Sequence, residues 1–100
     1  MAIFPTNMLE NKLTLDIIKA KFNYFELQIH ELHWQTFGLG EHEALGSAYD
    51  TVYQVKDEVV EKIMGYSGVR TKAMPVEPIK NYSPGLPNQI ISEAIVFAKQ

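Results

Sequence analysis

The chain has 100 residues, a formal net charge of −3 at pH 7 and no cysteine. That length makes one domain with one modest core, and 46% apolar and 21% charged residues match an ordinary folded domain. The absence of cysteine excludes disulfides, thiolate zinc sites, iron–sulfur clusters and a cysteine nucleophile.

The net charge and the hydropathy pattern also limit which partners and which cellular location we expect. A mildly acidic chain is a poor match for a phosphate backbone, so we expect no nucleic acid as a partner. No apolar run approaches the roughly 20 residues that span a bilayer, and residues 1–12 lack the charged-then-apolar order of a signal peptide. We therefore expect no membrane partner and a cytoplasmic location, with any chemistry resting on His, Asp, Glu or a bound ion.

A first amphipathic helix is predicted over residues 14–36, after an arm or loop at 1–13. Thr14 is a suitable N-cap, and Asp16 in the first turn favours the helix dipole. The glycine-containing run 37–40 ends this helix. Large apolar residues repeat within it at alternating steps of three and four, which is the spacing of one helix face: Leu15, Ile18, Phe22, Phe25, Ile29 and Leu32.

Three of the aromatic residues on this first helix are predicted to be core or interface residues. They are Phe22, Phe25 and Trp34. Their large apolar surface gains most from burial, which makes this role more common than any other for such side chains.

A second helix is predicted over residues 41–65. Glu41 in its first turn and Lys62 in its last match the helix dipole, and Gly65 and Gly68 supply the stop. Because the connection is short, the two helices form an antiparallel hairpin. The second helix has its own apolar seam: Leu45, Ala48, Val52, Val55, Val59 and Ile63.

Residues 66–88 change character and predict a Pro-rich loop or extended crossover. They hold four prolines and two glycines and show no period. Asn88 is a suitable cap for a partial third helix over 88–100, where apolar residues recur. The pattern has no stop signal before Gln100, which indicates a truncated product or a short tail that docks on a partner.

The expected fold is therefore all-α: one domain over residues 1–100, with an antiparallel helical hairpin and the start of a third helix. Two long helices and half of a third do not close a four-helix core. The apolar seams then need further residues or a second copy, so we expect a homo-oligomer.

All three histidines fall close together, at the end of the first helix and the start of the second. Glu26, His30 and His33 share a stripe of about 60° on the first helix. An antiparallel hairpin brings His33 near His42, whereas Asp57 and Glu61 lie about 22–28 Å further along the second helix. Two chains packed antiparallel could join the histidine end of one to the carboxylate end of the other.

Histidine and carboxylate without thiolate is ligand chemistry for iron, manganese or zinc, and helical bundles build di-metal sites from such residues. The alternative is that these side chains are ordinary solvated or boundary residues. Around Asp57, a plain charged face would also contain Lys56 and Lys62.

The run Leu32-His33-Trp34-Gln35-Thr36, a short glycine-containing turn and Glu41-His42-Glu43-Ala44-Leu45 resemble the ferritin-like superfamily. The resemblance covers residues 14–65 and is strongest to the Dps branch, the mini-ferritins. The run 41–46 with Tyr49-Asp50 and Asp57-Glu58 is also similar to small phage-encoded ferritin-like proteins, which would place the chain in a host cytoplasm. The fold implied is a ferritin-like four-helix bundle.

The resemblance implies a ferroxidase iron site shared by two subunits. His33 and His42 match the histidine positions of one subunit, and Asp57 and Glu61 match the carboxylates of the other. The turn is shorter than in Dps, so His30 competes with His33. Gly46 stands where the family has an aspartate. Iron or another divalent metal is therefore the expected cofactor, with degenerate or absent ferroxidase activity. The basic tail on which Dps DNA binding depends is missing.

Two other functions remain open from the residues. The first is a non-catalytic helical module for oligomerisation or protein interaction, which fits the small size and the unfinished third helix. The second is a di-metal hydrolase like the helical pyrophosphohydrolases. For that class, Asp57, Glu58 and Glu61 supply at most one of the several carboxylate clusters required.

Overall fold

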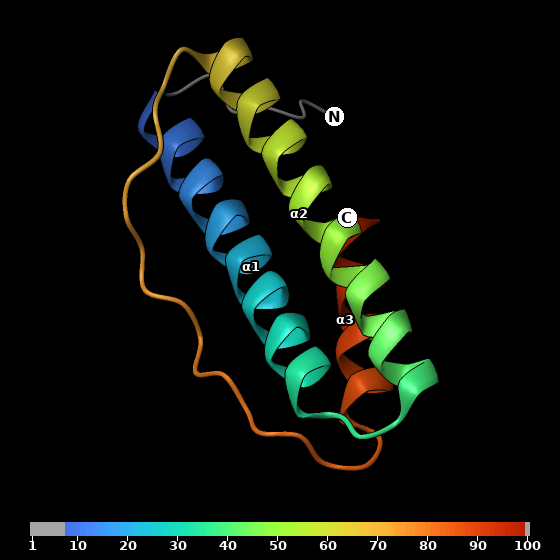
Figure 1. Cartoon of the computed structure of the whole chain (residues 1–100). Helices are drawn as coiled ribbons and strands as arrows, with labels where there is room; N and C mark the ends of the chain where they lie inside the picture. The colour runs from blue at the N-terminus through green and yellow to red at the C-terminus, as the bar shows by residue number, and fades with distance from the viewer. Residues whose placement is uncertain (1–7, 100) are drawn as a thin grey trace.

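The computed structural model is a long helical hairpin with a shorter third helix against it (Figure 1). Its helices are α1 (Met8–Gln35), α2 (Leu39–Ser67) and α3 (Leu86–Ala98). The structure describes the chain from residue 8 to residue 99, and its side chains from residue 15 onward. No strand occurs in this described part, which confirms the all-α prediction.

The apolar seam of α1 forms the core, as predicted. Two clusters of buried residues lie along the hairpin. The larger includes Phe25, Ile29 and Leu32 of α1 with Leu45 of α2 and Ile90 of α3. The smaller joins α1 to the far end of α2 and to the following loop through three residues, Leu15, Ile63 and Val69.

The start of α1 differs from the prediction. The helix begins at Met8, so Thr14 lies inside it and is not the N-cap, and Asp16 is not in the first turn. Of the predicted arm, residues 1–7 lie outside the described part of the chain. Asp16 is instead buried and accepts a hydrogen bond of 2.9 Å from the backbone N–H of Lys72. The carboxylate caps a distant backbone group, a role that local spacing does not reveal.

The ends of α2 also extend beyond the predicted 41–65. Gly65 continues the helix, and the stop is Gly68, whose left-handed φ of 76° favours glycine. Its backbone N–H donates to the carbonyl of Met64, which closes the last turn. Glu41 lies in the first turn as predicted, whereas Lys62 falls short of the last turn.

The segment 69–85 is an extended strap that runs back along α1 (Figure 1). The side chain of Gln28, fully buried, pairs with both backbone groups of Lys80: its Nε2 donates to the carbonyl at 3.0 Å and its Oε1 accepts from the N–H at 2.7 Å. Gln35 binds the strap in a similar way, through the N–H of Tyr82. An ion pair of 2.9 Å between Lys21 and Glu77 adds a charged contact. Side chains of α1 thus satisfy the polar backbone of a segment that has no sheet or helix of its own.

The strap sets the direction of α3. Gly85, with a φ of 86°, turns the chain into α3, where Pro87 occupies the first turn. The predicted cap Asn88 is therefore already inside the helix. The ring of Phe97 packs edge-on against Phe22 at a centroid distance of 5.1 Å.

The three helices form an incomplete bundle. α3 runs parallel to α2 and antiparallel to α1 (Figure 1). α1 packs against both of the other helices, while the backbones of α2 and α3 approach each other in few places. The result is a single long crossover between two parallel helices that are not close neighbours.

Replacing Gln28 tests whether its amide holds the strap. We expect Gln28→Leu to lower the free energy of unfolding by about 1–3 kcal/mol, because the backbone N–H and carbonyl of Lys80 lose their partners. Urea unfolding followed by circular dichroism measures the change. Gln54→Leu, at an exposed position of α2, is the control, and an equal loss in both variants would contradict the assigned role.

Candidate functional site

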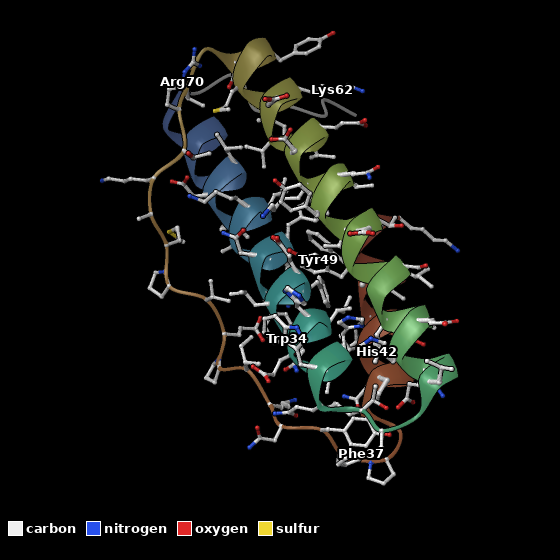
Figure 2. The ribbon with its side chains drawn as sticks, viewed as in Figure 1. Trp34, Phe37, His42, Tyr49, Lys62 and Arg70 are labelled. Atoms are coloured by element: carbon white, nitrogen blue, oxygen red, sulfur yellow. The ribbon has the colours of Figure 1, made fainter. Side chains whose placement is uncertain are left out.

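The hairpin end gathers the three histidines, as the sequence predicted. His30 and His33 come from the last turns of α1 and His42 from the first turns of α2. Figure 2 shows Trp34 and His42 near the turn, with Tyr49 further along the hairpin. The centroids of the His33 and His42 rings are 3.8 Å apart and their planes differ by 19°, so the rings are stacked.

His33 and His42 make reciprocal hydrogen bonds to each other's backbone. The Nδ1 of His33 lies 2.7 Å from the carbonyl oxygen of His42, and the Nδ1 of His42 lies 2.8 Å from the carbonyl oxygen of His33. Since a carbonyl only accepts, both Nδ1 atoms carry the proton. In the neutral rings Nε2 then holds the free lone pair, which is the arrangement of histidines that ligate metals.

The stack limits what these two rings can hold together. A metal ion lies in the plane of the imidazole that binds it, along the Nε2 lone pair. The planes of His33 and His42 are nearly parallel and offset by the stacking distance. One ion therefore cannot be bound by both rings unless one of them turns out of the stack.

Gly46 is explained by the packing of His33. A Cβ atom at position 46 would lie 3.0 Å from Cε1 of His33, closer than ordinary contacts allow. The His33 ring is held in place by its hydrogen bond and by its stack on His42. An aspartate at position 46 would therefore require the His33 ring to shift by a few tenths of an ångström from its observed position.

His30 sits apart from this pair in an aromatic setting. Its ring lies between Trp34, at a centroid distance of 3.8 Å, and Tyr49, at 3.9 Å. The His30 and His33 centroids are 6.1 Å apart. Trp34 is 64% exposed, so of its two predicted roles, core or interface, the core role is wrong and the interface role stays a prediction. Its position on α1 turns it away from the seam, and it covers His30 instead.

The carboxylates of the predicted site do not reach the histidines of the same chain. Glu26 pairs with Lys56, which also contacts Asn23. Asp57 and Glu61 are exposed on α2, and along this unbroken helix they lie about 22 and 28 Å beyond His42. Within the described residues, no group of three or more His, Asp or Glu side chains is placed to hold a metal ion.

A polar cluster next to the turn escaped the sequence analysis. Oε1 of Glu41 accepts hydrogen bonds from the hydroxyl of Thr36 at 2.5 Å and from the hydroxyl of Tyr82 at 2.8 Å. It thereby joins the start of α2 to the end of α1 and to the strap. These bonds hold the pKa of Glu41 below its ordinary value, and the bond to Glu41 raises the pKa of Tyr82. The contact between Thr36 and Glu41 could have been predicted from the sequence, because only a short turn separates the two residues. The contact with Tyr82 could not, because Tyr82 is 41 residues away from Glu41 in the chain.

Comparisons with protein-family models, curated proteins and solved structures gave no match to this chain. Among the described helices, none combines the length and the apolar character that crossing a membrane requires.

The Gly46 contact predicts opposite effects for two glycines of α2. Gly46→Ala should destabilise the fold by about 1–2 kcal/mol, because the new methyl group pushes on the His33 ring and disturbs its hydrogen bond and its stack on His42. Gly65→Ala should stabilise it by about 0.5–1 kcal/mol, since a Cβ there meets nothing within 4 Å and alanine favours the helix. Urea unfolding measures both.

A double-mutant cycle isolates the cause. With His33→Ala in the background, Gly46→Ala should become neutral or stabilising. If Gly46→Ala destabilised the protein equally with and without His33, the contact would not be the reason.

The hydrogen bonds of Glu41 predict that the stability of the fold decreases at both acidic and basic pH. The folded-state pKa of Glu41 is lowered, so its stabilising contribution is present above the unfolded-state pKa and is lost as the pH falls through the folded-state pKa. The pKa of Tyr82 is raised, so its contribution is lost as the pH rises through that value. Tyr82→Phe should shift the Glu41 pKa upward in an NMR titration, and the control Tyr53→Phe should leave it unchanged.

Proposed function

We propose that this protein is a ferritin-like helical protein that binds iron or another divalent metal ion at an interface between two copies, with little or no ferroxidase activity. The observation that carries the proposal is the pair of histidines whose Nδ1–H groups are anchored on backbone carbonyls. Metal-binding histidines almost always have such an anchor, because it fixes the tautomer and the ring.

The chain topology supports the ferritin-like part of the proposal. Four-helix bundles of this class have one long crossover connection, and the other helix connections are short. The hairpin of α1 and α2, the strap and an α3 parallel to α2 correspond to the first three helices of such a bundle.

The residues of one chain are not a complete metal site, and this leads to the second copy. The donor types suit a divalent ion, but one chain brings only His33 and His42 together, with His30 beside them. Asp57 and Glu61 lie at the other half of α2 and are exposed. An antiparallel partner would place its Asp57 and Glu61 beside these histidines. One imidazole would keep its backbone anchor and ligate the ion through Nε2, and the other would give up the stack and its anchor to join it.

The weak ferroxidase activity follows from Gly46. The resemblance to Dps assigns a ligating aspartate to this position, and the ring of His33 occupies the space next to it. A site with one carboxylate fewer holds less iron and stabilises its oxidised form less. We therefore place metal binding ahead of iron oxidation.

A second candidate function is a non-catalytic helical module that binds other proteins. An open apolar groove between α2 and α3 favours it. In this case the His33–His42 pair would serve as a clasp for the hairpin.

Titration with Co²⁺, followed by visible absorption, and with Fe²⁺ under anaerobic conditions tests the metal proposal. We expect binding by a dimer or larger species in light scattering. His33→Gln and Glu61→Gln should each weaken binding by about tenfold or more, the scale of lost ligands and supporting contacts. Glu58→Gln, the exposed neighbour of Asp57, is the matched control and should bind like the parent protein.

Mixing the two defective variants distinguishes a shared site from two separate effects. A dimer of one His33→Gln chain and one Glu61→Gln chain contains one intact site, so the mixture should recover part of the binding. Absence of binding in the parent protein would overturn the proposal, and so would failure of the mixture to recover any.

A further inference from the structure

An apolar groove of about 300 Å³ lies between α2 and α3. The strap runs along the opposite side of α1 (Figure 1) and takes no part in the lining. The floor of the groove is α1, with Phe25 and Ile29. Its walls are α2, with Val52 and Val55, and α3, with Ala94 and Ile95. Val55 is 37% exposed and Ile95 51% exposed, so the groove presents apolar surface to water. A gain in free energy is therefore available to whatever covers it.

The apolar lining of the groove favours a helical ligand over an extended peptide. Its lining is made of side chains on three helices, whose own backbone groups are already bonded, and only the hydroxyls of Ser47 and Thr51 are polar there. An extended peptide would leave its backbone N–H and carbonyl groups without partners in such a groove, whereas a helix satisfies its own.

The chain directions of α2 and α3 favour one orientation of the bound helix. α2 and α3 are parallel, so their dipoles point the same way. A helix antiparallel to both offsets both dipoles, as α1 does beneath them. Alanines at positions 48 and 94 leave room for a close approach.

The charged residues beside the groove indicate which charge a bound helix should carry. At 100° per residue, Glu43, Asp50 and Glu58 lie along the solvent side of α2 beside the lining position Ser47. They are exposed, and no ion pair within the described residues involves them. Asp50 lies within the lined stretch 47–55 of α2, Glu43 about one turn before it and Glu58 about one turn after it, whereas Lys62 lies about two turns after it. The margin of α2 is therefore acidic beside the groove and for one turn at either end.

The described helices of this chain do not offer a matching edge. Lys19 and Lys21 bind the strap, through the carbonyl of Lys72 and through Glu77, and Lys56 binds Glu26. Lys62 is exposed on α2, but a single lysine close in sequence to the acidic residues 57, 58 and 61 is not a basic edge. With a net charge of −3, a second copy would also meet the acidic margin with like charge. A different polypeptide is the better match.

We propose that the groove between α2 and α3 binds one amphipathic α-helix of a partner polypeptide, antiparallel to both helices, with lysine or arginine along the edge that faces α2. The proposal gives the second candidate function a partner of defined chemistry. It does not depend on the histidines or on metal.

A synthetic helical peptide is the probe. It has about 15 residues, or about 22 Å of helix, with leucines at steps of three and four and lysines along one edge. Fluorescence anisotropy of the labelled peptide measures its binding to the full chain. We expect the lysine peptide to bind about tenfold tighter than the same peptide with glutamates on that edge, and the difference to shrink with added salt.

Two substitutions locate the binding surface. Val55→Lys places a charge in the groove wall at a half-exposed position, so the fold should tolerate it, and we expect about a tenfold loss of peptide affinity. Leu27→Lys, at a position of α1 that is 50% exposed and outside the groove, is the matched control. Glu58→Gln should lower the affinity about twofold to fivefold. Circular dichroism checks that each variant is folded.

The outcomes separate this proposal from the others. Equal binding of the lysine and glutamate peptides, or no effect of Val55→Lys, would overturn it. A stable dimer that Val55→Lys disrupts and Leu27→Lys does not would also overturn it, because a second copy would then cover the groove. His33→Gln should bind the peptide like the parent protein, so failure of the metal proposal leaves this one standing.

Discussion

The double hydrogen bond between the buried amide of Gln28 and the backbone of Lys80 is the constraint on which the arrangement of the helices depends. It fixes an extended, Pro-rich strap against α1 and returns the chain to the turn end of the hairpin. α3 must then run parallel to α2. Because parallel helices joined in this way are not close neighbours, the groove between them stays open. Together with the contacts of Asp16, Lys21 and Gln35, this buried side chain of α1 thus holds the strap whose course leaves apolar surface exposed.

The sequence contained enough information for the two long helices and their antiparallel pairing. The seam from Leu15 to Leu32 has a strict helical spacing, and that spacing alone requires a helix with one buried face. By contrast, no pattern in the sequence around Asp16 indicates its role in the fold. Its carboxylate bonds a backbone group 56 residues away, so a residue that looked like a helix-start signal is a long-range cap. The core role predicted for Trp34 was wrong for a related reason. The size of its side chain favours burial, but its position on α1 directs the side chain away from the core.

The candidate site shows the same division. Pairing of the helices predicts that His33 and His42 meet, because the turn between them is short. It does not predict the reciprocal Nδ1 bonds or the contact of His33 with Gly46, because both depend on side-chain rotamers. The carboxylates of Asp57 and Glu61 lie outside any one-chain site, so the part in metal binding that we propose for them depends on a second copy.

The uneven length of the helices implies uneven local stability. α3 has 13 residues against 28 in α1, so it covers α1 only as far as Phe22. Beyond that point the hairpin is held by the small cluster of Leu15, Ile63 and Val69. Amide protons there should exchange with solvent through local opening, well before those near Ile29 and Ile90. The molecule therefore consists of a slowly exchanging half, which carries the histidines and the groove, and a half that frays first.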